Sequence, residues 1–590
     1  MERVEQPCRN FQFLSSAVIQ DPQDGNEKVV FASFVTKGKG ELIVIDPVTG
    51  GGERIVLPEG PGAWALHNWQ SDKLLVGTCE HYPQAQLFSL DLKSRTWAEP
   101  LWVEDETYIW NWAEGSDGMI YGGTYPGCLL LQYDPHQHVL RNLGRASDNL
   151  ENMYLREVNG SIPGFILISG GYQSTFVRAW DIEKEVFFDF CEAPAELDQL
   201  TDTYLRIKIK DQLVYYDPRT FSLMEPPHLE AAMEEVSPAR PLGTCVQILG
   251  DGRTIGIRGQ QYWIQETDGI CSPLLDIPVE APPSAILTLT ADEEGRIWGS
   301  SNFGQTIFSY VPASGSYWNS PVVCNSGGEV YGMCVVEGRL FLAAYSGGDH
   351  VVYDPAQPWN QLDNINPRTL QTVAPQLVRP SGKSVVGPDG AVWTGWAAKY
   401  GTYGGGLSRV DPQTLEVLSW YDPVPEQQIV GLSADSRYLY FTTDTAGNGL
   451  KAKSTSRYLV VWDPAASAEV HRELLEEPEA LRVLLACAGR VWMERDGQIH
   501  IFNPQTLSWE NPIPLGESCT CMVQVNDATI ALFGERYLYE LHVEHRKAVQ
   551  VGELPGDVGT AVVSPNDEMF FASGSWLYRL GLRRVENGGL

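Results

Sequence analysis

Two short patterns in the sequence place a phenol beside a guanidinium. NMYLRE contains Tyr154 and Arg156, and DTYLRI contains Tyr204 and Arg206. Residues two apart lie on the same face of a β-strand. A guanidinium pairs bidentately with a carboxylate, and a neighbouring tyrosine or histidine could remove a proton α to that carboxylate. The alternative is that each arginine pairs with a glutamate of the protein itself.

Histidine is scarce, with ten residues in the chain. His67 and His81 fall in one repeat unit, which makes them candidate bases. We therefore predict four catalytic residues: His67, His81, Tyr154 and Arg156. The alternative for any single histidine is a structural role with satisfied hydrogen bonds.

Aromatic and polar residues recur at the expected starts of first strands and in the loops after second strands. In a strand repeat, these segments converge on one face around a central channel. There they could surround a sugar-sized pocket, or they could plug the corners of the repeats. The predicted ligand-binding residues are Trp64, Tyr82, Glu104, Tyr108, Trp110, Tyr125, Glu151, Tyr172, Arg206, Tyr345 and His350.

The segment Tyr108–Gly144 indicates which elements hold these side chains. It contains four short apolar runs, separated by Ser-Asp-Gly, Pro-Gly and Asp-Pro turns. Four antiparallel strands in about 40 residues are what one propeller blade needs.

The turn after the third strand recurs along the chain as Asp-Pro or a close variant. Its Asp or Asn side chain is expected to accept hydrogen bonds from backbone N–H groups two residues further on. With an earlier Asp-Gly turn as a second marker, we find about thirteen repeats at blade spacing. The predicted fold is all-β: two tandem β-propellers with about six or seven four-stranded blades each.

The boundary between the rings is expected near Cys324, which gives domains 1–324 and 325–590. The alternative is that the N-terminal strands in Phe11–Pro58 close a ring with C-terminal blades. Two segments have helical composition and are predicted to be short surface helices: Pro227–Val236 and Ala468–Leu484.

The net charge of −33 over 590 residues disfavours binding to nucleic acid or to an anionic membrane surface. Eleven cysteines without a CxxC pair, together with no secretory signal, predict a cytoplasmic protein. The sequence has no metal-binding motif, so we predict no metal and no cofactor, while a divalent metal between blades stays open. The expected partner is a small molecule or an oligosaccharide, and the oligomeric state is open.

The blade repeats, with their Asp-Pro turns and the YGGTYPG corner at Tyr121–Gly127, resemble the broad YVTN/PQQ-like group of bacterial propellers. The architecture is similar to that of propeller enzymes that act on carbohydrates. That resemblance implies a lyase or a glycosidase acting on an acidic oligosaccharide. A glycosidase would need two opposed carboxylates, for which Glu104, Glu106 and Glu151 are candidates. The alternative is a non-catalytic ligand-binding or protein-interaction scaffold.

Overall fold

The computed structural model describes residues 1–36, 38–79, 84–171, 174–227, 243–477 and 479–582. The chain forms two compact units, which are Phe11–Glu280 and a second unit made of Met1–Asn10 with Ala281–Leu590. This division differs from the boundary expected near Cys324, because Cys324 lies inside the second unit, packed between two of its blades.

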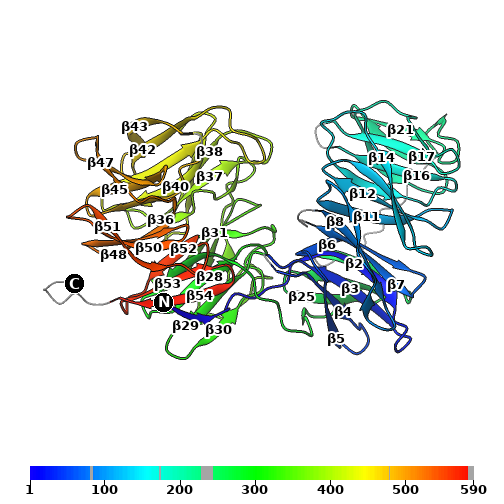
Figure 1. Ribbon diagram of the computed structural model, residues 1–590, viewed down its shortest axis with the longest axis horizontal. Coiled ribbons are helices and arrows are strands. Elements are labelled where there is room, and N and C mark those ends of the chain that lie inside the picture. Colours follow the sequence, from blue (N-terminus) through cyan, green and yellow to red (C-terminus); the bar gives the residue numbers. More distant parts are fainter. Residues whose placement is uncertain (37, 80–83, 172–173, 228–242, 478, 583–590) are drawn as a thin grey trace. The chain divides into compact units, whose positions relative to one another are not determined.

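The described residues of Phe11–Glu280 form six antiparallel sheets, and we call this unit the six-bladed propeller (Figure 1). The first three blades are β2 (Phe13–Gln20), β3 (Glu27–Ser33), β4 (Glu41–Ile45), β5 (Gly52–Val56); β6 (Gly62–Trp69), β7 (Lys73–Cys79), β8 (Ala85–Asp91), β9 (Thr96–Trp97), β10 (Leu101–Val103); and β11 (Tyr108–Glu114), β12 (Ile120–Tyr125), β13 (Leu129–Asp134), β14 (Val139–Arg145). The other three are β15 (Leu155–Asn159), β16 (Phe165–Gly170), β17 (Phe176–Asp181), β18 (Val186–Phe188); β19 (Ala195–Leu200), β20 (Leu205–Ile209), β21 (Gln212–Tyr216), β22 (Leu223–Met224); and β23 (Thr244–Ile248), β24 (Thr254–Arg258), β25 (Gln261–Gln265), β26 (Leu275–Asp276).

The described part of the second unit forms seven sheets, and we call it the seven-bladed propeller. Its first four blades are β27 (Ile286–Ala291), β28 (Ile297–Ser301), β29 (Ile307–Val311), β30 (Ser316–Asn319); β31 (Val330–Val336), β32 (Arg339–Ala344), β33 (Asp349–Tyr353), β34 (Arg368–Thr369); β35 (Leu377–Arg379), β36 (Ser384–Val386), β37 (Val392–Ala398), β38 (Gly405–Val410), β39 (Val417–Tyr421); and β40 (Gln428–Ala434), β41 (Leu439–Asp444), β42 (Ser456–Asp463), β43 (Ala468–Glu476). The last three are β44 (Leu484–Cys487), β45 (Arg490–Arg495), β46 (Gln498–Asn503), β47 (Ser508–Pro514); β48 (Cys519–Asn526), β49 (Thr529–Gly534), β50 (Tyr537–His542), β51 (Lys547–Glu553); and β52 (Thr560–Val563), β53 (Glu568–Ser573), β54 (Trp576–Gly581), β1 (Glu2–Glu5).

Two tandem propellers and a four-stranded blade are thus confirmed. The predicted turn chemistry is also present. Asp134 Oδ1, for example, accepts hydrogen bonds from the backbone N–H groups of His136 at 2.9 Å and Gln137 at 3.0 Å. Equivalent bonds to the residue two positions on are made by Asp46, Asp91, Asp217, Asp354, Asp411, Asp463 and Asn503.

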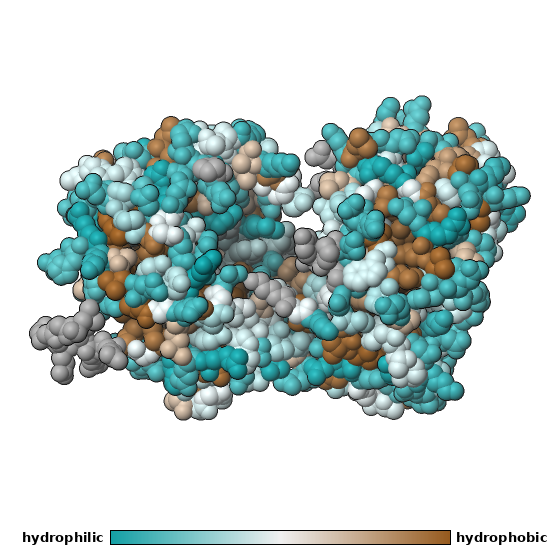
Figure 2. Space-filling model, in the orientation of Figure 1, coloured by the Kyte–Doolittle hydropathy of each residue, from teal (hydrophilic) through white to brown (hydrophobic). Residues whose placement is uncertain are grey.

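The hydrophobic core lies between neighbouring blades rather than at the centre of each ring. One cluster joins Leu75 and Leu87 of the second blade to Ile109, Ile120 and Tyr133 of the third. The same arrangement is repeated between successive blades of the seven-bladed propeller. Because each sheet buries both faces, most outward-facing residues are hydrophilic, as Figure 2 shows for the visible face.

Each ring closes by a different connection. In the six-bladed propeller, Gln247 Nε2 on β23 donates to Ser16 O and Ser16 Oγ on β2, at 3.0 and 2.9 Å. In the seven-bladed propeller, β1 pairs antiparallel with β54 and is the outermost strand of the last blade. Figure 1 accordingly marks the N-terminus beside β54. The closing strand is therefore Glu2–Glu5, and not the segment Phe11–Pro58, which contains the first blade of the six-bladed propeller.

The predicted helix at Ala468–Leu484 is wrong over most of its length, because Ala468–Glu476 is strand β43 and pairs along its whole length with β42. Pairing with a neighbouring edge overrides helical propensity, which is a weak preference. The other predicted helix, Pro227–Val236, lies outside the described residues apart from Pro227. Among the described residues, no helix is long and apolar enough to cross a membrane.

Removing Glu2–Glu5 tests ring closure. The deletion leaves β54 as an unpaired edge and removes the ion pair between Arg579 and Glu2, at 2.6 Å. We expect backbone amides of β53 and β54 to exchange hydrogen faster, while β16 and β17 of the six-bladed propeller keep their protection. Unchanged exchange in β53 and β54 would contradict this account of closure.

Candidate functional site

Five aromatic residues predicted from the sequence meet in the six-bladed propeller. They come from the starts of β6 and β11, the end of β12 and the residue before β15, and we call them the aromatic platform: Trp64, Tyr108, Trp110, Tyr125 and Tyr154. Ring centroids are 5.1 Å apart for Trp64–Trp110, 5.2 Å for Tyr108–Trp110, 5.1 Å for Tyr108–Tyr125, 5.8 Å for Trp110–Tyr154 and 4.5 Å for Tyr125–Tyr154. All five side chains are half-buried, so part of each ring faces solvent.

A repeated β-bulge explains how three blades contribute to this site. The pairing of each first strand with its second strand shifts register between Ala63 and Ala65, between Ile109 and Asn111, and between Leu155 and Glu157. The residue inside each shift is Trp64, Trp110 and Arg156 respectively. A bulge re-aims the side chain at its extra residue, so these three residues occupy equivalent positions in successive blades.

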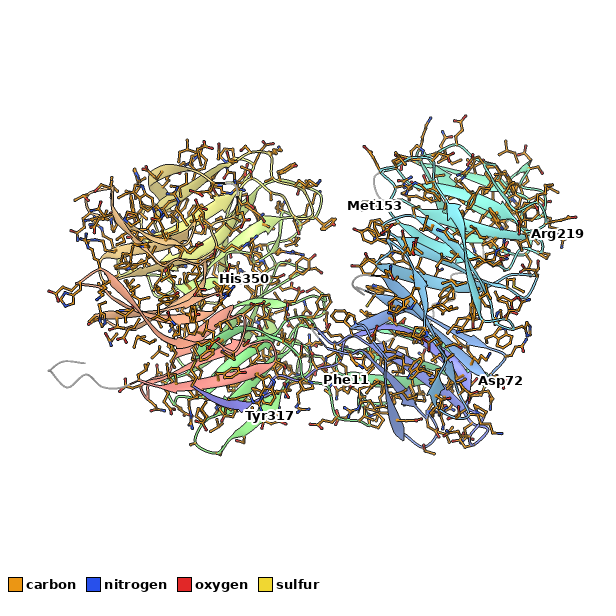
Figure 3. All side chains as sticks on the ribbon, viewed as in Figure 1. Phe11, Asp72, Met153, Arg219, Tyr317 and His350 are labelled. Carbon is orange, nitrogen blue, oxygen red and sulfur yellow. The ribbon has the colours of Figure 1, made fainter. Side chains whose placement is uncertain are left out.

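Arg156 lies against the platform. Its guanidinium carbon is 4.8 Å from the centroid of the Tyr154 ring and 5.4 Å from that of Trp110. Both contacts are within the range of cation–π attraction. The Tyr154–Arg156 pair predicted from the sequence therefore exists, and Met153, the residue directly before it, is exposed at the edge of the unit (Figure 3).

The two predicted arginines differ in their partners. Arg206 forms an ion pair with Asp198, which is the structural alternative considered for both. Arg156 is exposed, stacks on two rings and has no carboxylate partner among the described residues.

Two residues not predicted as site residues hold the loops around the platform. Arg145 donates to Gly127 O at 2.6 Å, Asn149 O at 2.8 Å and Asn152 O at 2.6 Å. Glu106, considered only as a catalytic carboxylate, accepts from Gly127 N at 3.0 Å, and burial raises the pKa of its carboxyl group. These contacts tie the loop after Tyr125 to the loop before Tyr154. No sequence motif signals them, because their partners are backbone groups.

His67 lies apart from the platform contacts. It sits towards the far end of β6, where its Nε2 is 4.0 Å from Glu114 Oε2. Burial lowers the pKa of the imidazole, and Nε2 is buried without a hydrogen-bond partner among the described residues. The other predicted residues of these loops, His81, Tyr82 and Tyr172, lie outside the described residues.

The remaining predicted residues do not join the platform. Glu104 and Glu151 are exposed. Tyr345 belongs to the seven-bladed propeller, where the Arg379 guanidinium lies 4.3 Å above its ring.

His350 is also in the seven-bladed propeller, among its sheets (Figure 3). It is 2% exposed and shares a 2.8 Å hydrogen bond with Ser408 Oγ. Its ring meets Trp396 edge to face, and burial lowers its pKa to about 3. These contacts give His350 a structural role rather than the ligand-binding role predicted from the sequence.

Across the described ranges, no group of three or more His, Cys, Asp or Glu side chains could hold a metal ion. The platform itself consists of aromatic rings, phenols and one guanidinium. Its chemistry therefore suits stacking and anion pairing rather than metal coordination.

The sequence matches no protein-family model and no curated protein. Among solved structures, hydrazine synthase from Kuenenia stuttgartiensis aligns at 12% identity with a TM-score of 0.41, covering 50% of this chain and 95% of the other. A catalytically inactive virginiamycin B lyase from Staphylococcus aureus with quinupristin aligns at 9% identity with a TM-score of 0.38, covering 51% of this chain and 96% of the lyase. The WD40 domain of Neurospora crassa Pan2 aligns at 11% identity with a TM-score of 0.40, covering 50% and 88%. Similarities this low support no inference about function.

Arg145→Gln tests whether Arg145 positions the loops of the platform. The variant loses charge-assisted hydrogen bonds to three backbone carbonyls, so we expect the free energy of local opening at Asn149–Asn152 to fall by about 1–3 kcal/mol. Hydrogen exchange of these amides measures it. Arg141→Gln, which changes an exposed side chain of the same strand, is the control, and equal exchange in the two variants would contradict the assignment.

Because His350 is buried, we expect the free energy of unfolding of the seven-bladed propeller to depend on pH. Its folded-state pKa of about 3 lies below the unfolded value of about 6.5. The unfolded chain therefore binds a proton that the folded chain does not, and stability is lost as the pH falls below about 6.5. Between pH 7.5 and 5.5 this group should lower the free energy of unfolding by about 1.4 kcal/mol.

Urea unfolding of the seven-bladed propeller in the full chain measures this dependence. In His350→Gln, which loses stability at pH 7.5, the difference from the natural chain should shrink by that amount at pH 5.5. His545→Gln, at an exposed position, is the control. A difference that stays constant with pH would contradict the prediction.

Proposed function

We propose that the six-bladed propeller binds a short oligosaccharide that contains a uronate residue. The observation that supports this most is the placement of the Arg156 guanidinium, which has no carboxylate partner among the described residues, over Tyr154 and Trp110. A pyranose ring presents C–H groups that pack against aromatic rings, and its carboxylate can pair with the guanidinium.

The exposure of the platform favours a ligand over a purely structural role. Fully buried tryptophans occur elsewhere in the chain, as at Trp393 and Trp492, where they pack between blades. Trp64 and Trp110 keep part of their surface accessible, and Trp110 Nε1 has no hydrogen-bond partner among the described residues. Partly exposed aromatic rings with a few convergent polar groups are typical of binding sites.

The net charge of the chain, −33, argues for a ligand of low charge density. A strongly acidic surface repels polyanions at long range, whereas one arginine can recognise one carboxylate at close range. An oligosaccharide that combines a uronate with neutral sugars fits both conditions.

The geometry favours binding over catalysis. A lyase needs a base next to the carbon that loses its proton, and His67 lies towards the far end of its strand, near Glu114. A glycosidase needs two opposed carboxylates. The carboxyl group of Glu106 is engaged with Gly127 N, and Glu104 and Glu151 are exposed in two different loops. A lyase that uses Tyr154 as its base is the second candidate, because Tyr154 adjoins Arg156.

Titration of tryptophan fluorescence with a panel of short uronate oligosaccharides, each paired with its neutral counterpart, tests the proposal. We expect the natural chain to prefer the uronate. Arg156→Gln should reduce that preference by about tenfold or more, because the guanidinium–carboxylate pair is lost. Trp110→Ala should weaken binding of both sugars.

Arg206→Gln is the matched control, since Arg206 is paired with Asp198 and should leave the preference unchanged. No binding of any panel member, or an undiminished preference in Arg156→Gln, would refute the proposal. Absorbance of unsaturated products in the same mixtures, lost in Tyr154→Phe, would instead establish the lyase.

A further inference from the structure

The central channel of the seven-bladed propeller contains a cavity of about 520 Å³. All seven innermost segments line it, with residues near the start of each first strand, such as Thr288 on β27, Thr520 on β48 and Thr560 on β52. The cavity therefore opens the channel at the face where the innermost strands begin. Its volume falls within the roughly 300–1,000 Å³ of small-molecule sites.

The charged residues lining this cavity are both cations. Lys383 lies between β35 and β36, Arg482 lies two residues before β44, and no aspartate or glutamate is among the described lining residues. Neither cation forms an ion pair or a side-chain hydrogen bond with any described residue. Both side chains are exposed to the solvent of the channel. In a chain with a net charge of −33, two cations in one cavity without a carboxylate among the described lining residues suggest an anionic ligand.

Lys383 lines the cavity at an interruption of the innermost strand. Its φ of 60° is in the left-handed region, which costs free energy for a residue with a side chain. Around it, the innermost strand is split, with β35 and β36 pairing separately to β37. Gly382 N donates to Gly395 O at 3.0 Å and Gly395 N donates to Lys383 O at 3.2 Å, which hold the split in place.

The side chain of Lys383 is exposed to solvent in the channel, so a dissolved anion can reach it.

Hydroxyl groups around the cavity fix its shape. Ser381 Oγ donates to Ile429 O at 2.7 Å, Thr520 Oγ1 donates to Val558 O at 2.7 Å, and Thr560 Oγ1 accepts from Leu289 N at 3.0 Å. Each bond joins neighbouring blades, so the lining is preorganised. Thr560 Oγ1 only accepts in this bond, so its hydroxyl can still donate to a ligand beside the two cations.

We propose that this cavity binds a small organic dianion, with Lys383 and Arg482 each pairing with one negative charge. Dicarboxylates and phosphate monoesters share this chemistry, because a guanidinium pairs with either group and an ammonium acts as a point charge for both. The site is independent of the aromatic platform, which belongs to the other propeller.

Isothermal titration of the full chain with succinate, citrate, glucose 6-phosphate and inorganic phosphate tests the proposal. We expect one of the organic anions to bind, and to bind more weakly as salt increases. The anion that binds distinguishes carboxylate from phosphoryl recognition. Lys383→Met and Arg482→Gln should each weaken binding by about tenfold or more.

Lys399→Met is the matched control, because it removes the same charge from an exposed position of the same propeller. Circular dichroism establishes that the variants fold. If Lys383→Met does not fold, Arg482→Gln still tests the proposal, because Arg482 lies outside the strained segment. The proposal is overturned if no organic anion binds at millimolar concentrations, or if binding is unchanged in both cavity variants.

Discussion

The packing of each sheet against its two neighbours is the interaction on which this structure depends. Every blade has two apolar faces, so an open array would leave a hydrophobic face exposed at each end. Closing the ring buries both of these faces against each other. In the seven-bladed propeller, Phe570 and Leu577 of the last blade pack with Leu289 and Phe308 of the first blade. Burying such side chains contributes about 1.5–3 kcal/mol each. The closed ring then fixes where the first strands begin, and both proposed sites use those positions.

Much of the fold could be predicted from the sequence because its signals are local. Asp134, for example, accepts hydrogen bonds from the backbone N–H groups two and three residues further on. Such a turn can be recognised in the sequence without knowing the rest of the fold. Ring closure is not local, since β1 pairs with a strand at the other end of the chain. The boundary between the propellers was misplaced for that reason. The strand Ala468–Glu476 was mistaken for a helix because pairing with β42, rather than composition, determines its structure.

The candidate site was partly predictable, most directly where its residues are close together in the sequence. The spacing of Tyr154 and Arg156 suggested a pair, and the structure brings them together, although a bulge rather than regular strand alternation sets their geometry. Arg145 was missed because it acts on backbone carbonyls of distant loops. Lys383 was missed because its position depends on a split strand. His350 has the sequence context of a loop ligand, but its hydrogen bond to Ser408 is formed between strands that sequence cannot place together.

The central claim is that the aromatic platform with Arg156 is a binding site for a uronate-containing sugar. A crystal structure of the full chain grown with a short uronate oligosaccharide tests it most directly. The account predicts a sugar ring against Trp110 and Tyr154, with its carboxylate within hydrogen-bonding distance of the Arg156 guanidinium. A sugar bound at another position of either propeller, with the platform free of ligand, would contradict it.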